Sequence, residues 1–387
     1  MIIPEQRKKI VIVGPAFPYR GGNSLFVSHL YDSLIKEFDV EVVNFSMLYP
    51  SFLFPGSTQF DESTSLIKKT PNKRLINSIN PFTWISTARY IKSLNPDLIA
   101  FDWWQPFFGP AYYIISSLLR SQFKNKVLFI TENVISHESR SIDKILTRFG
   151  LKHASSFLAL SGKVASDLEI IRANRPVFRS ELPVYDCYNF SGSFNRDQLR
   201  AKLGYKPEHK VMLFFGYIRK YKGLDLLLHA TRHLVQADPL YRLLIVGESY
   251  ENIEDYTSLI KQLGIEHAVT LIEKFIPNEE VGNYYVPADV VVLPYRSGTQ
   301  SGILNVAYGF NKPVVVTDVG GLAESLIDGK TGFLVKKPNP VAIAESIKHF
   351  FEIQNKTNFT EEIELFVKNN GFNTINETFN TILKQTH

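Results

Sequence analysis

Short runs of apolar residues alternate with glycine-containing loops and amphipathic segments along this chain. Such runs indicate buried strands at residues 10–13, 40–45, 98–101, 127–131, 156–160, 210–215, 241–246, 269–272, 290–293 and 314–317. Helical spacing of apolar residues predicts helices at 24–36, 80–94, 163–171, 224–235, 256–263, 279–285, 303–310, 341–351 and 373–384. Strands that alternate with helices form parallel sheets covered on both faces, so the pattern predicts an α/β protein.

The pattern starts twice, once at residue 10 and again at residue 210, each time as strand, glycine and helix. A chain of 387 residues is also long for one core, so we expect two doubly wound domains. The turn-rich stretch at 183–194 contains the predicted boundary. The predicted domains are 1–188 and 189–370, and residues 371–387 form a last helical segment.

The strongest single signal is the strand–loop–helix unit between residues 290 and 310. Its Gly/Ser-rich loop brings Ser301, Gly302 and Ile303 to the start of a helix. Free backbone N–H groups and the helix dipole favour an anion at such a position. We therefore expect an anionic ligand there.

Composition and charge narrow the classes of function. Hydrophobic residues make up 44% and charged residues 21% of the chain, which is typical of a globular protein. The net charge of +5 permits an anionic ligand but gives no reason to expect nucleic acid. The start lacks the apolar core of a signal peptide, and Cys187 is the single cysteine. These features favour the cytoplasm.

An aromatic stretch at residues 101–113, FDWWQPFFGPAYY, allows more than one interpretation. Packing in the core is one of them, because aromatic side chains bury large areas. An acceptor groove or a shallow contact with the inner face of the membrane is the other, because basic residues lie nearby in the sequence. These are Lys68, Lys69, Lys73, Arg74, Arg120, Lys124 and Lys126.

Two loops in the first half follow strands and carry candidate ligand-binding residues. The strand at 127–131 ends in TENVISHES, which places Glu132, Asn133 and His137 where α/β folds bind ligands. After the first strand, Gly21 and Gly22 precede a helix, although the spacing of the glycines does not match a dinucleotide-binding motif. A tight turn that requires glycine is the alternative interpretation of this pair.

From residue 210 onward the motifs occur in an order that resembles the retaining GT-B glycosyltransferases of the family 4 type. They are FFGYIRKYKGLDLLLHA, LLIVGES, VTLIEKFIPNEEV, ADVVVLPY, NKPVVVTDVGGLAE and DGKTGFLV. The aromatic stretch and LPVYD suggest a bacterial branch, in which polysaccharide synthesis is a common role. The resemblance implies GT-B architecture, with two Rossmann-like domains facing across a cleft and residues 371–387 crossing back to the first domain.

The resemblance also implies roles for individual residues. Arg219 and Lys222, in the loop after Gly216, would stabilise the leaving diphosphate together with the N–H groups near Gly302 and Ile303. Backbone near Ile276 would contact the base of a UDP- or GDP-sugar. In the first domain, His137 would lie beside the reacting sugar, and Gly21, Gly22, Glu132 and Asn133 would face the acceptor. The family needs no metal or other cofactor.

One departure from the family concerns the donor loop. The family carries two glutamates eight positions apart, but Gly298 and Val306 occupy those positions here. No Asp or Glu occurs between Asp289 and Asp318. The neutral residues Gln300, Ser301 and Asn305 are the available replacements for contacts to the sugar.

Three hypotheses about function follow. The first is a metal-independent retaining glycosyltransferase that moves a sugar from a nucleotide donor to a glycan or lipid-linked acceptor. The second is another GT-B enzyme, a nucleotide-sugar epimerase or a phosphorylase. The third is a non-catalytic nucleotide-sugar-binding protein, which the missing glutamates favour.

Overall fold

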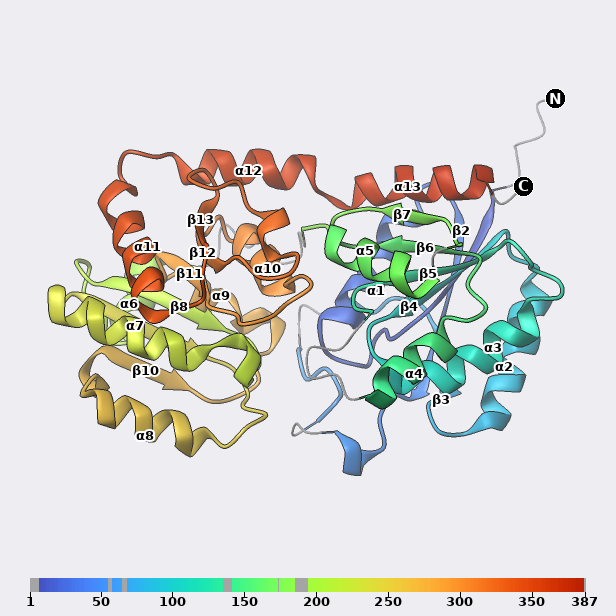
Figure 1. Cartoon of the computed structure of the whole chain (residues 1–387), viewed down its shortest axis with the longest axis horizontal. Helices are drawn as coiled ribbons and strands as arrows, with labels where there is room; N and C mark the ends of the chain where they lie inside the picture. Colours follow the sequence, from blue (N-terminus) through green and yellow to red (C-terminus); the bar gives the residue numbers. More distant parts are fainter. Residues whose placement is uncertain are drawn as a thin grey trace. The chain divides into compact units, whose positions relative to one another are not determined.

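The computed structural model describes residues 7–54, 58–64, 68–134, 141–172, 174–184 and 194–385, and they divide into two compact units. Unit 1 comprises Met1–Glu62, Ile67–Pro183 and Phe372–His387. Unit 2 comprises Ser63–Leu66 and Val184–Gly371. In each unit, helices flank a parallel sheet (Figure 1). Both units are therefore Rossmann-like α/β folds.

Unit 1 contains a seven-stranded sheet in the order β3-β2-β1-β4-β5-β6-β7. The strands are β1 (Lys9–Val13), β2 (Asp39–Met47), β3 (Lys73–Asn77), β4 (Leu98–Trp103), β5 (Val127–Thr131), β6 (Ser156–Ala159) and β7 (Val177–Arg179). The helices are α1 (Gly22–Leu34), α2 (Pro81–Leu94), α3 (Gly109–Leu119), α4 (Ser141–Gly150), α5 (Gly162–Arg172) and α13 (Phe372–Gln385), with 3-10 turns η1 (Ser51–Leu53) and η2 (Pro106–Phe108). Strand order reverses direction between β1 and β4, which pair in parallel.

Unit 2 contains a six-stranded sheet in the order β10-β9-β8-β11-β12-β13. The strands are β8 (Lys210–Phe215), β9 (Tyr241–Val246), β10 (Val269–Ile272), β11 (Val290–Leu293), β12 (Val314–Thr317) and β13 (Gly332–Val335). The helices are α6 (Arg196–Lys202), α7 (Leu224–Ala237), α8 (Ile253–Leu263), α9 (Gly282–Tyr285), α10 (Gly302–Gly309), α11 (Pro340–Ile353) and α12 (Phe359–Asn369), with 3-10 turns η3 (Lys220–Lys222), η4 (Glu266–Ala268), η5 (Asn278–Glu280) and η6 (Leu322–Ser325). Here the order reverses between β8 and β11, which also pair in parallel.

The aromatic stretch at 101–113 supplies core residues of unit 1. Phe101, Trp103, Phe108 and Tyr112 are all fully buried, and the rings of Phe101 and Tyr112 lie 5.2 Å apart. The core-packing interpretation is therefore correct for these four side chains. Most of this stretch lies in β4, η2 and α3 rather than in a groove.

Four helices of the described residues were not predicted, namely α3, α4, α6 and α12. The helix α3 is apolar on nearly every side, because it packs against both α2 and α4, so it lacks an amphipathic period. The apolar residues of α4 and α12 do recur at helical spacing, so the sequence contained a signal for both helices that the prediction did not use. Between β2 and α2, where the sequence predicted no strand or helix, the structure has η1 at Ser51–Leu53 and β3 at Lys73–Asn77.

The observed units differ from the predicted boundaries by a few residues. Unit 1 ends at Pro183, where we expected residue 188, and the chain returns to it at Phe372, where we expected residue 371. The return is made by α13, which packs against α1 and β7 (Figure 1). The side chain of Ser33 on α1 donates a hydrogen bond of 2.9 Å to Asn376 on α13. This end of the chain thus completes unit 1.

Candidate functional site

The reversal of strand order in unit 2 brings two loops together. One loop follows β8 and begins with Gly216, and the other follows β11 and begins with Pro294. Ligands of open α/β sheets bind at the carboxyl ends of the strands at such a reversal. The backbone N–H of Arg296 donates a hydrogen bond of 2.7 Å to the carbonyl of Tyr221, which ties the two loops to each other.

Glycine is required at two positions of the first loop. Gly216 and Gly223 have φ values of 100° and 67°, which other residues rarely adopt. A Cβ atom at Gly223 would lie 2.1 Å from the carbonyl oxygen of Pro294, so a side chain would push the two loops apart. The Gly216–Gly223 loop therefore depends on glycine for both its turn and its contact with the end of β11.

Lys222 is buried at the base of this loop. Its side chain is 8% exposed, and its Nζ lies 5.6 Å from the centre of the Tyr295 ring. Burial, together with the nearby charge of Arg219, lowers the pKa of Lys222 to about 7. A lysine in such an environment gains from an incoming anion, which would stabilise its charged form. The structure thus excludes a solvated surface lysine at this position.

The start of helix α10 lies beside Lys222. A Cβ atom placed on Gly216 would be 3.3 Å from Nζ of Lys222 and 3.0 Å from Cδ1 of Ile303. The first turn of α10 has no acidic residue, and Ser301 makes no side-chain cap. The first amides of a helix lack an intrahelical acceptor, so those of Gly302 and Ile303 are suited to an anion. The side chain of Ile303, in the first turn of α10, and the amine of Lys222 thus both lie next to Gly216.

The other cations near this site are held by partners. Arg296 forms an ion pair with Asp225, with nitrogen–oxygen distances of 2.6 and 2.5 Å. The guanidinium carbon of Arg219 lies 4.8 Å from the centre of the Tyr250 ring, and that ring stacks on Tyr217 at 4.5 Å. Tyr217 thus helps to support Arg219.

Gly298 of the donor loop packs closely against Leu322. A Cβ atom on Gly298 would lie 2.5 Å from Cδ1 of Leu322, and Gly321 donates a backbone hydrogen bond of 3.3 Å to the Gly298 carbonyl. Val306, the second position, is buried. A side chain at residue 298 would therefore require Leu322 to move.

The predicted neutral replacements lie on the same loop and helix. Ser301 Oγ is 3.3 Å from the hydroxyl of Tyr295, and Asn305 is buried in α10. The side-chain oxygen of Gln300 is buried and accepts no hydrogen bond from the described residues. Gln300 is thus the side chain in this loop with an unused polar atom.

Ile276 lies farther from these groups in the sheet. It follows β10, the edge strand, which is separated from β8 by β9. Ile276 is buried, and the adjoining turn is held by Asn278, whose N–H donates a hydrogen bond of 3.0 Å to Ser63.

Unit 1 has its own group of polar residues at the reversal between β1 and β4. Gly21 and Gly22 mark the start of α1, and Gly21 has a φ of 109°. Glu132 follows β5, and its N–H donates a hydrogen bond of 3.1 Å to the carbonyl of Trp103 in β4. Asn133 comes next. His137, the predicted sugar-contacting residue, lies outside the described residues.

Asp102 belongs to this group and was not predicted. It is fully buried in β4, and neither carboxylate oxygen accepts a hydrogen bond within the described residues. Burial and the charge of Glu132 raise the pKa of Asp102, and burial raises the pKa of Glu132 to about 7. Gly14 leaves room for the side chain of Asp102, since a Cβ atom at residue 14 would lie 2.9 Å from Cβ of Asp102. The signal that could have identified Asp102 from the sequence is an acidic residue inside an apolar strand.

Three of the basic residues that the sequence suggested for a membrane contact have local partners. Lys68 pairs with Asp32 at 2.6 Å, Lys126 lies 3.9 Å from Asp97, and Arg74 donates to backbone carbonyls of β2. They serve local contacts in unit 1.

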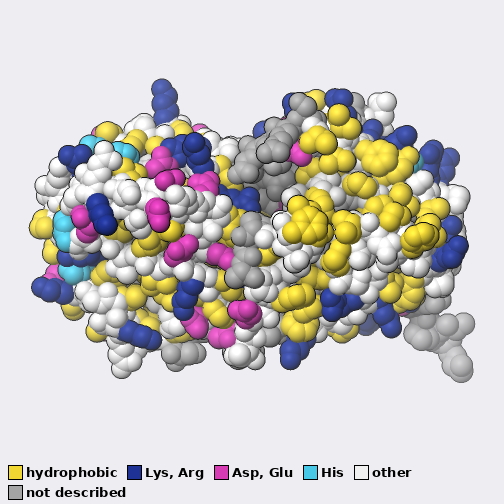
Figure 2. Space-filling model, turned by 90° about the horizontal axis from the view of Figure 1, so that it is seen from below, with side chains coloured by type: hydrophobic (Ala, Val, Ile, Leu, Met, Phe, Trp, Pro, Cys, Tyr) yellow, Lys and Arg dark blue, Asp and Glu magenta, His cyan; other side chains and the backbone are white. Residues whose placement is uncertain are grey.

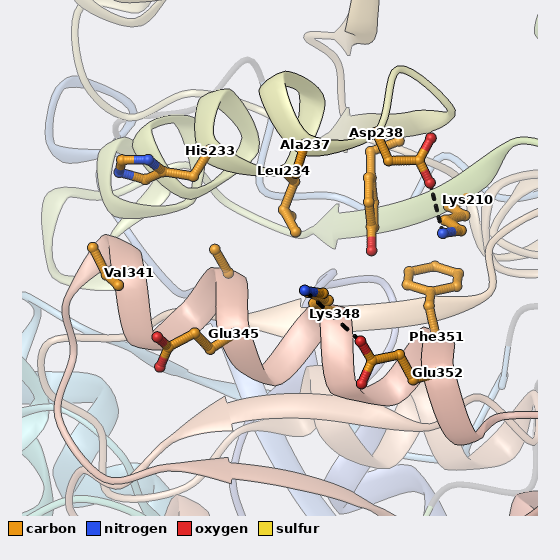
Figure 3. Close-up of a pocket in the computed structure, with 12 residues that line it drawn as sticks. Lys210, His233, Leu234, Ala237, Asp238, Val341, Glu345, Lys348, Phe351 and Glu352 are labelled. Atoms are coloured by element: carbon orange, nitrogen blue, oxygen red, sulfur yellow. Dashed lines mark hydrogen bonds and ion pairs between the residues drawn. The ribbon is translucent and has the colours of Figure 1, made fainter.

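A pocket of about 350 Å³ opens elsewhere in unit 2, between α7 and α11 (Figure 3). It includes Lys210 and Tyr241, the first residues of β8 and β9, so it lies at the opposite end of the sheet from Lys222. Lys210 pairs with Asp238 at 2.7 Å, and Lys348 lies 3.9 Å from Glu352. Its charged groups are thus largely paired with one another.

Comparison with known proteins identifies the domain that holds the Lys222 site. Residues 195–364 match the family model described as "Glycosyl transferases group 1". Residues 195–364 are thus similar to that family. The matched residues include Gly216, Lys222 and the whole of α10.

Curated relatives resemble the same part of the chain. The D-inositol 3-phosphate glycosyltransferase of Corynebacterium diphtheriae is 32% identical over 163 residues, which are 41% of this chain and 38% of that protein. The D-inositol 3-phosphate glycosyltransferase 1 of Catenulispora acidiphila is 35% identical over 162 residues, 40% of this chain and 38% of that protein. The match thus spans well under half the length of these relatives.

Solved structures resemble the chain over nearly its full length. Anabaena HepE in complex with UDP-glucose has a TM-score of 0.75 at 18% identity and covers 97% of this chain and 99% of that one. Sucrose-phosphate synthase from Thermosynechococcus elongatus has a TM-score of 0.71 at 17% identity, with coverage of 98% and 99%. Such likeness shows the fold, and the chain therefore has the GT-B architecture that the sequence predicted.

Proposed function

We propose that this protein is a retaining glycosyltransferase that uses a nucleoside diphosphate sugar and needs no metal ion. The observation that carries the proposal is buried Lys222 beside the start of α10, within a group 1 glycosyl transferase domain. A diphosphate placed there would receive the amine of Lys222 and the amides of Gly302 and Ile303. It would also restore the positive charge that burial disfavours on Lys222.

The chemistry requires stabilisation of the leaving group. The bond between the anomeric carbon and the diphosphate oxygen breaks, and negative charge develops on that oxygen. Lys222, Arg219 and the amides of α10 would bind this charge. The acceptor oxygen forms the new bond on the same face of the sugar, and its proton passes to the departing phosphate. Among the described residues no three His, Cys, Asp or Glu side chains cluster as metal ligands, so the proposal assigns this role to cations.

For the donor we propose a UDP-sugar, with a GDP-sugar as the alternative. The support is Anabaena HepE, of similar fold, whose structure contains UDP-glucose. Backbone near Ile276 would contact the base. In the absence of the two glutamates, the unused oxygen of Gln300 would accept a hydrogen bond from a sugar hydroxyl, and Ser301 and Asn305 would assist.

For the acceptor we propose a glycan or a lipid-linked sugar, handled by unit 1. His137 would lie beside the reacting sugar, with Gly21, Gly22, Glu132 and Asn133 on the acceptor side. Replacing His137 with alanine should reduce transfer and leave UDP binding unchanged, because UDP would contact unit 2. Equal transfer by the variant and the wild type would contradict this role. We also propose that the protein acts in the cytoplasm, at the inner face of the membrane.

Binding of UDP and UDP-glucose, measured by calorimetry, tests the site. Lys222→Met keeps the length of the side chain but removes the charge, so UDP should bind about tenfold more weakly or worse. Lys220→Met is the matched control, because Lys220 lies on the same 3-10 turn and is exposed. Equal UDP affinity for wild type and Lys222→Met would contradict the proposal.

The packing at Gly298 supports a second candidate, a protein that binds the nucleotide sugar without transferring it. Donor binding with no transfer to a panel of glycan and lipid-linked acceptors would favour it. Interconversion of sugar nucleotides without an acceptor would indicate an epimerase, and dependence on added phosphate would indicate a phosphorylase.

A further inference from the structure

We propose that unit 1 docks on an anionic membrane surface through an exposed apolar face formed by η1, α2 and α4. Large apolar side chains are exposed there to an unusual degree. Phe52 and Phe82 are 81% and 82% exposed, and Ile145 is 66% exposed. The apolar face consists of Phe52, Leu53, Ile79, Phe82, Ile85, Ile142, Ile145 and Phe149.

Helix α4 shows that this exposure is organised. Ile142, Ile145 and Phe149 are exposed and spaced three and four residues apart, so they form one stripe along the helix. The opposite side packs tightly: a Cβ atom on Gly150 would lie 2.5 Å from the ring of Trp103, and Gly109 contacts the Leu146 backbone. Helix α4 thus buries Thr147 and Gly150 in unit 1 and turns its stripe of large apolar side chains outward.

Helix α2 continues the same face. Phe82 and Ile85 are exposed, whereas Trp84, Ala88 and Ile91 are buried against the core. The start of the helix is fixed by Asn80, whose side chain accepts a hydrogen bond of 3.1 Å from the N–H of Phe82. Because α2 packs on α3 and α3 packs on α4, the three helices form one layer. Figure 2 shows hydrophobic side chains gathered on unit 1, the right-hand half of the view.

The charges of this layer favour a lipid surface as the occupant. Helices α2, α3 and α4 contain Arg89, Lys92, Lys144 and Arg148 but only one acidic residue, Asp143. Arg89, Lys144 and Arg148 are exposed, and the last two alternate with the apolar stripe of α4. Apolar side chains that enter the acyl boundary, flanked by Lys and Arg at the level of the phosphates, are typical of interfacial helices. Protein interfaces, by contrast, are depleted in lysine.

In the proposed contact, unit 1 lies on the membrane surface and does not cross it. No described helix has both the length and the apolar character needed to cross a bilayer. Exposed Ile and Phe side chains at several separate elements would each enter the headgroup region by a short distance. The face is independent of the proposed chemistry, because Lys222 and α10 belong to unit 2.

Co-sedimentation of the full chain with vesicles, without donor or acceptor, tests the proposal. We expect binding to an equimolar mixture of phosphatidylcholine and phosphatidylglycerol, and much weaker binding to phosphatidylcholine alone. Higher salt should weaken it through screening. Lys144→Gln with Arg148→Gln should reduce affinity by about fivefold for each charge removed. Ile142→Ser with Ile145→Ser should also reduce it.

The matched control is Ile170→Ser with Leu365→Ser. These side chains are 79% and 55% exposed but lie on α5 and α12, outside the apolar face. The control should bind vesicles as the wild type does, and equal melting temperatures would show that each variant folds. No vesicle binding by the wild type, or equal loss in the control, would overturn the proposal. So would concentration-dependent dimerisation in sedimentation velocity that Ile142→Ser with Ile145→Ser abolishes, since the face would then bind protein.

Discussion

At the scale of single residues, burial decides the chemistry of this protein more than residue type does. Lys222 resembles its exposed neighbour Lys220 in the sequence, yet only Lys222 is buried and has its pKa lowered to about 7. Asp102 and Glu132 are similar in kind to many surface carboxylates, yet burial raises the pKa of both. Lys222 and Glu132, whose pKa values both lie at about 7, are therefore poised to respond to pH near neutrality.

Nucleotide binding should depend on the protonation of Lys222. The amine is charged below about pH 7 in the free protein, and a bound diphosphate would raise its pKa. The dissociation constant for UDP should therefore increase as pH rises above 7, by up to about tenfold per pH unit. Calorimetric titrations of UDP into wild type and Lys222→Met from pH 6 to 9 measure this dependence. The variant lacks the amine, so its pH profile shows the contribution of UDP's own titration. Parallel pH profiles for the two proteins would contradict the expectation.

Unfolding should reveal the raised pKa of Glu132. A carboxyl group whose pKa is raised on folding holds a proton more tightly in the folded state. Its contribution to stability is therefore complete below the ordinary value of 4.5 and is lost as pH rises through about 7. The free energy of unfolding should fall over that range in the wild type and fall less in Glu132→Gln. Urea denaturation at several pH values checks this, and an identical slope in both proteins would be the contrary result.

At the scale of elements, the sequence predicted strands better than helices. The central parallel strands are covered on both faces, so they appear as short apolar runs, as at β11 and β12. Helix α3 was missed because it is nearly apolar all round. Such a helix lacks the polar contrast on which the prediction relies.

The contact between the two loops of the Lys222 site should depend on Gly223. The residues Gly223 and Gly264 follow short helices with φ values of 67° and 66°, but only a Cβ on Gly223 would meet the Pro294 carbonyl. Gly264→Ala should therefore lower the free energy of unfolding by about 1 kcal/mol, because only the left-handed backbone conformation disfavours a side chain there. Gly223→Ala should destabilise more and also weaken UDP binding. Thermal melts and UDP titrations of the two variants compare them, and equal effects would show that the Pro294 contact is unimportant.

At the scale of the whole molecule, segments distant in the sequence complete each unit. The last helix, α13, stacks Phe372 on His29 of α1, with ring centres 5.2 Å apart. Asn376 and Phe379 are buried against the same unit. In unit 2, the N–H and hydroxyl of Thr64 each donate a hydrogen bond of 2.8 Å to Glu279. Neither link has a local signal, because each joins residues that are more than 200 positions apart.

Loss of packing in α13 should therefore destabilise unit 1 selectively. Phe379 is fully buried, so Phe379→Ala should lower the stability of unit 1 by roughly 3–5 kcal/mol. All three tryptophans, Trp84, Trp103 and Trp104, lie in unit 1, so their fluorescence reports its unfolding. Protection by UDP reports unit 2. If Phe379→Ala lowers the melting temperature measured by fluorescence but leaves UDP affinity unchanged, the prediction is supported. If fluorescence and UDP binding are lost together, the two units unfold as one, which would contradict it.

By itself, the sequence determined the α/β alternation, the two doubly wound folds and the loops that hold Gly216, Lys222 and Gly302. These depend on local order: apolar runs, turn glycines and helix starts follow one another along the chain. The tertiary structure alone decided which polar groups lose contact with water. The low pKa of Lys222, the buried Asp102 beside Glu132, the closed position at Gly298 and the outward stripe of α4 all arise from packing between distant segments. Desolvation depends on what covers a residue, and neighbours in sequence do not specify that.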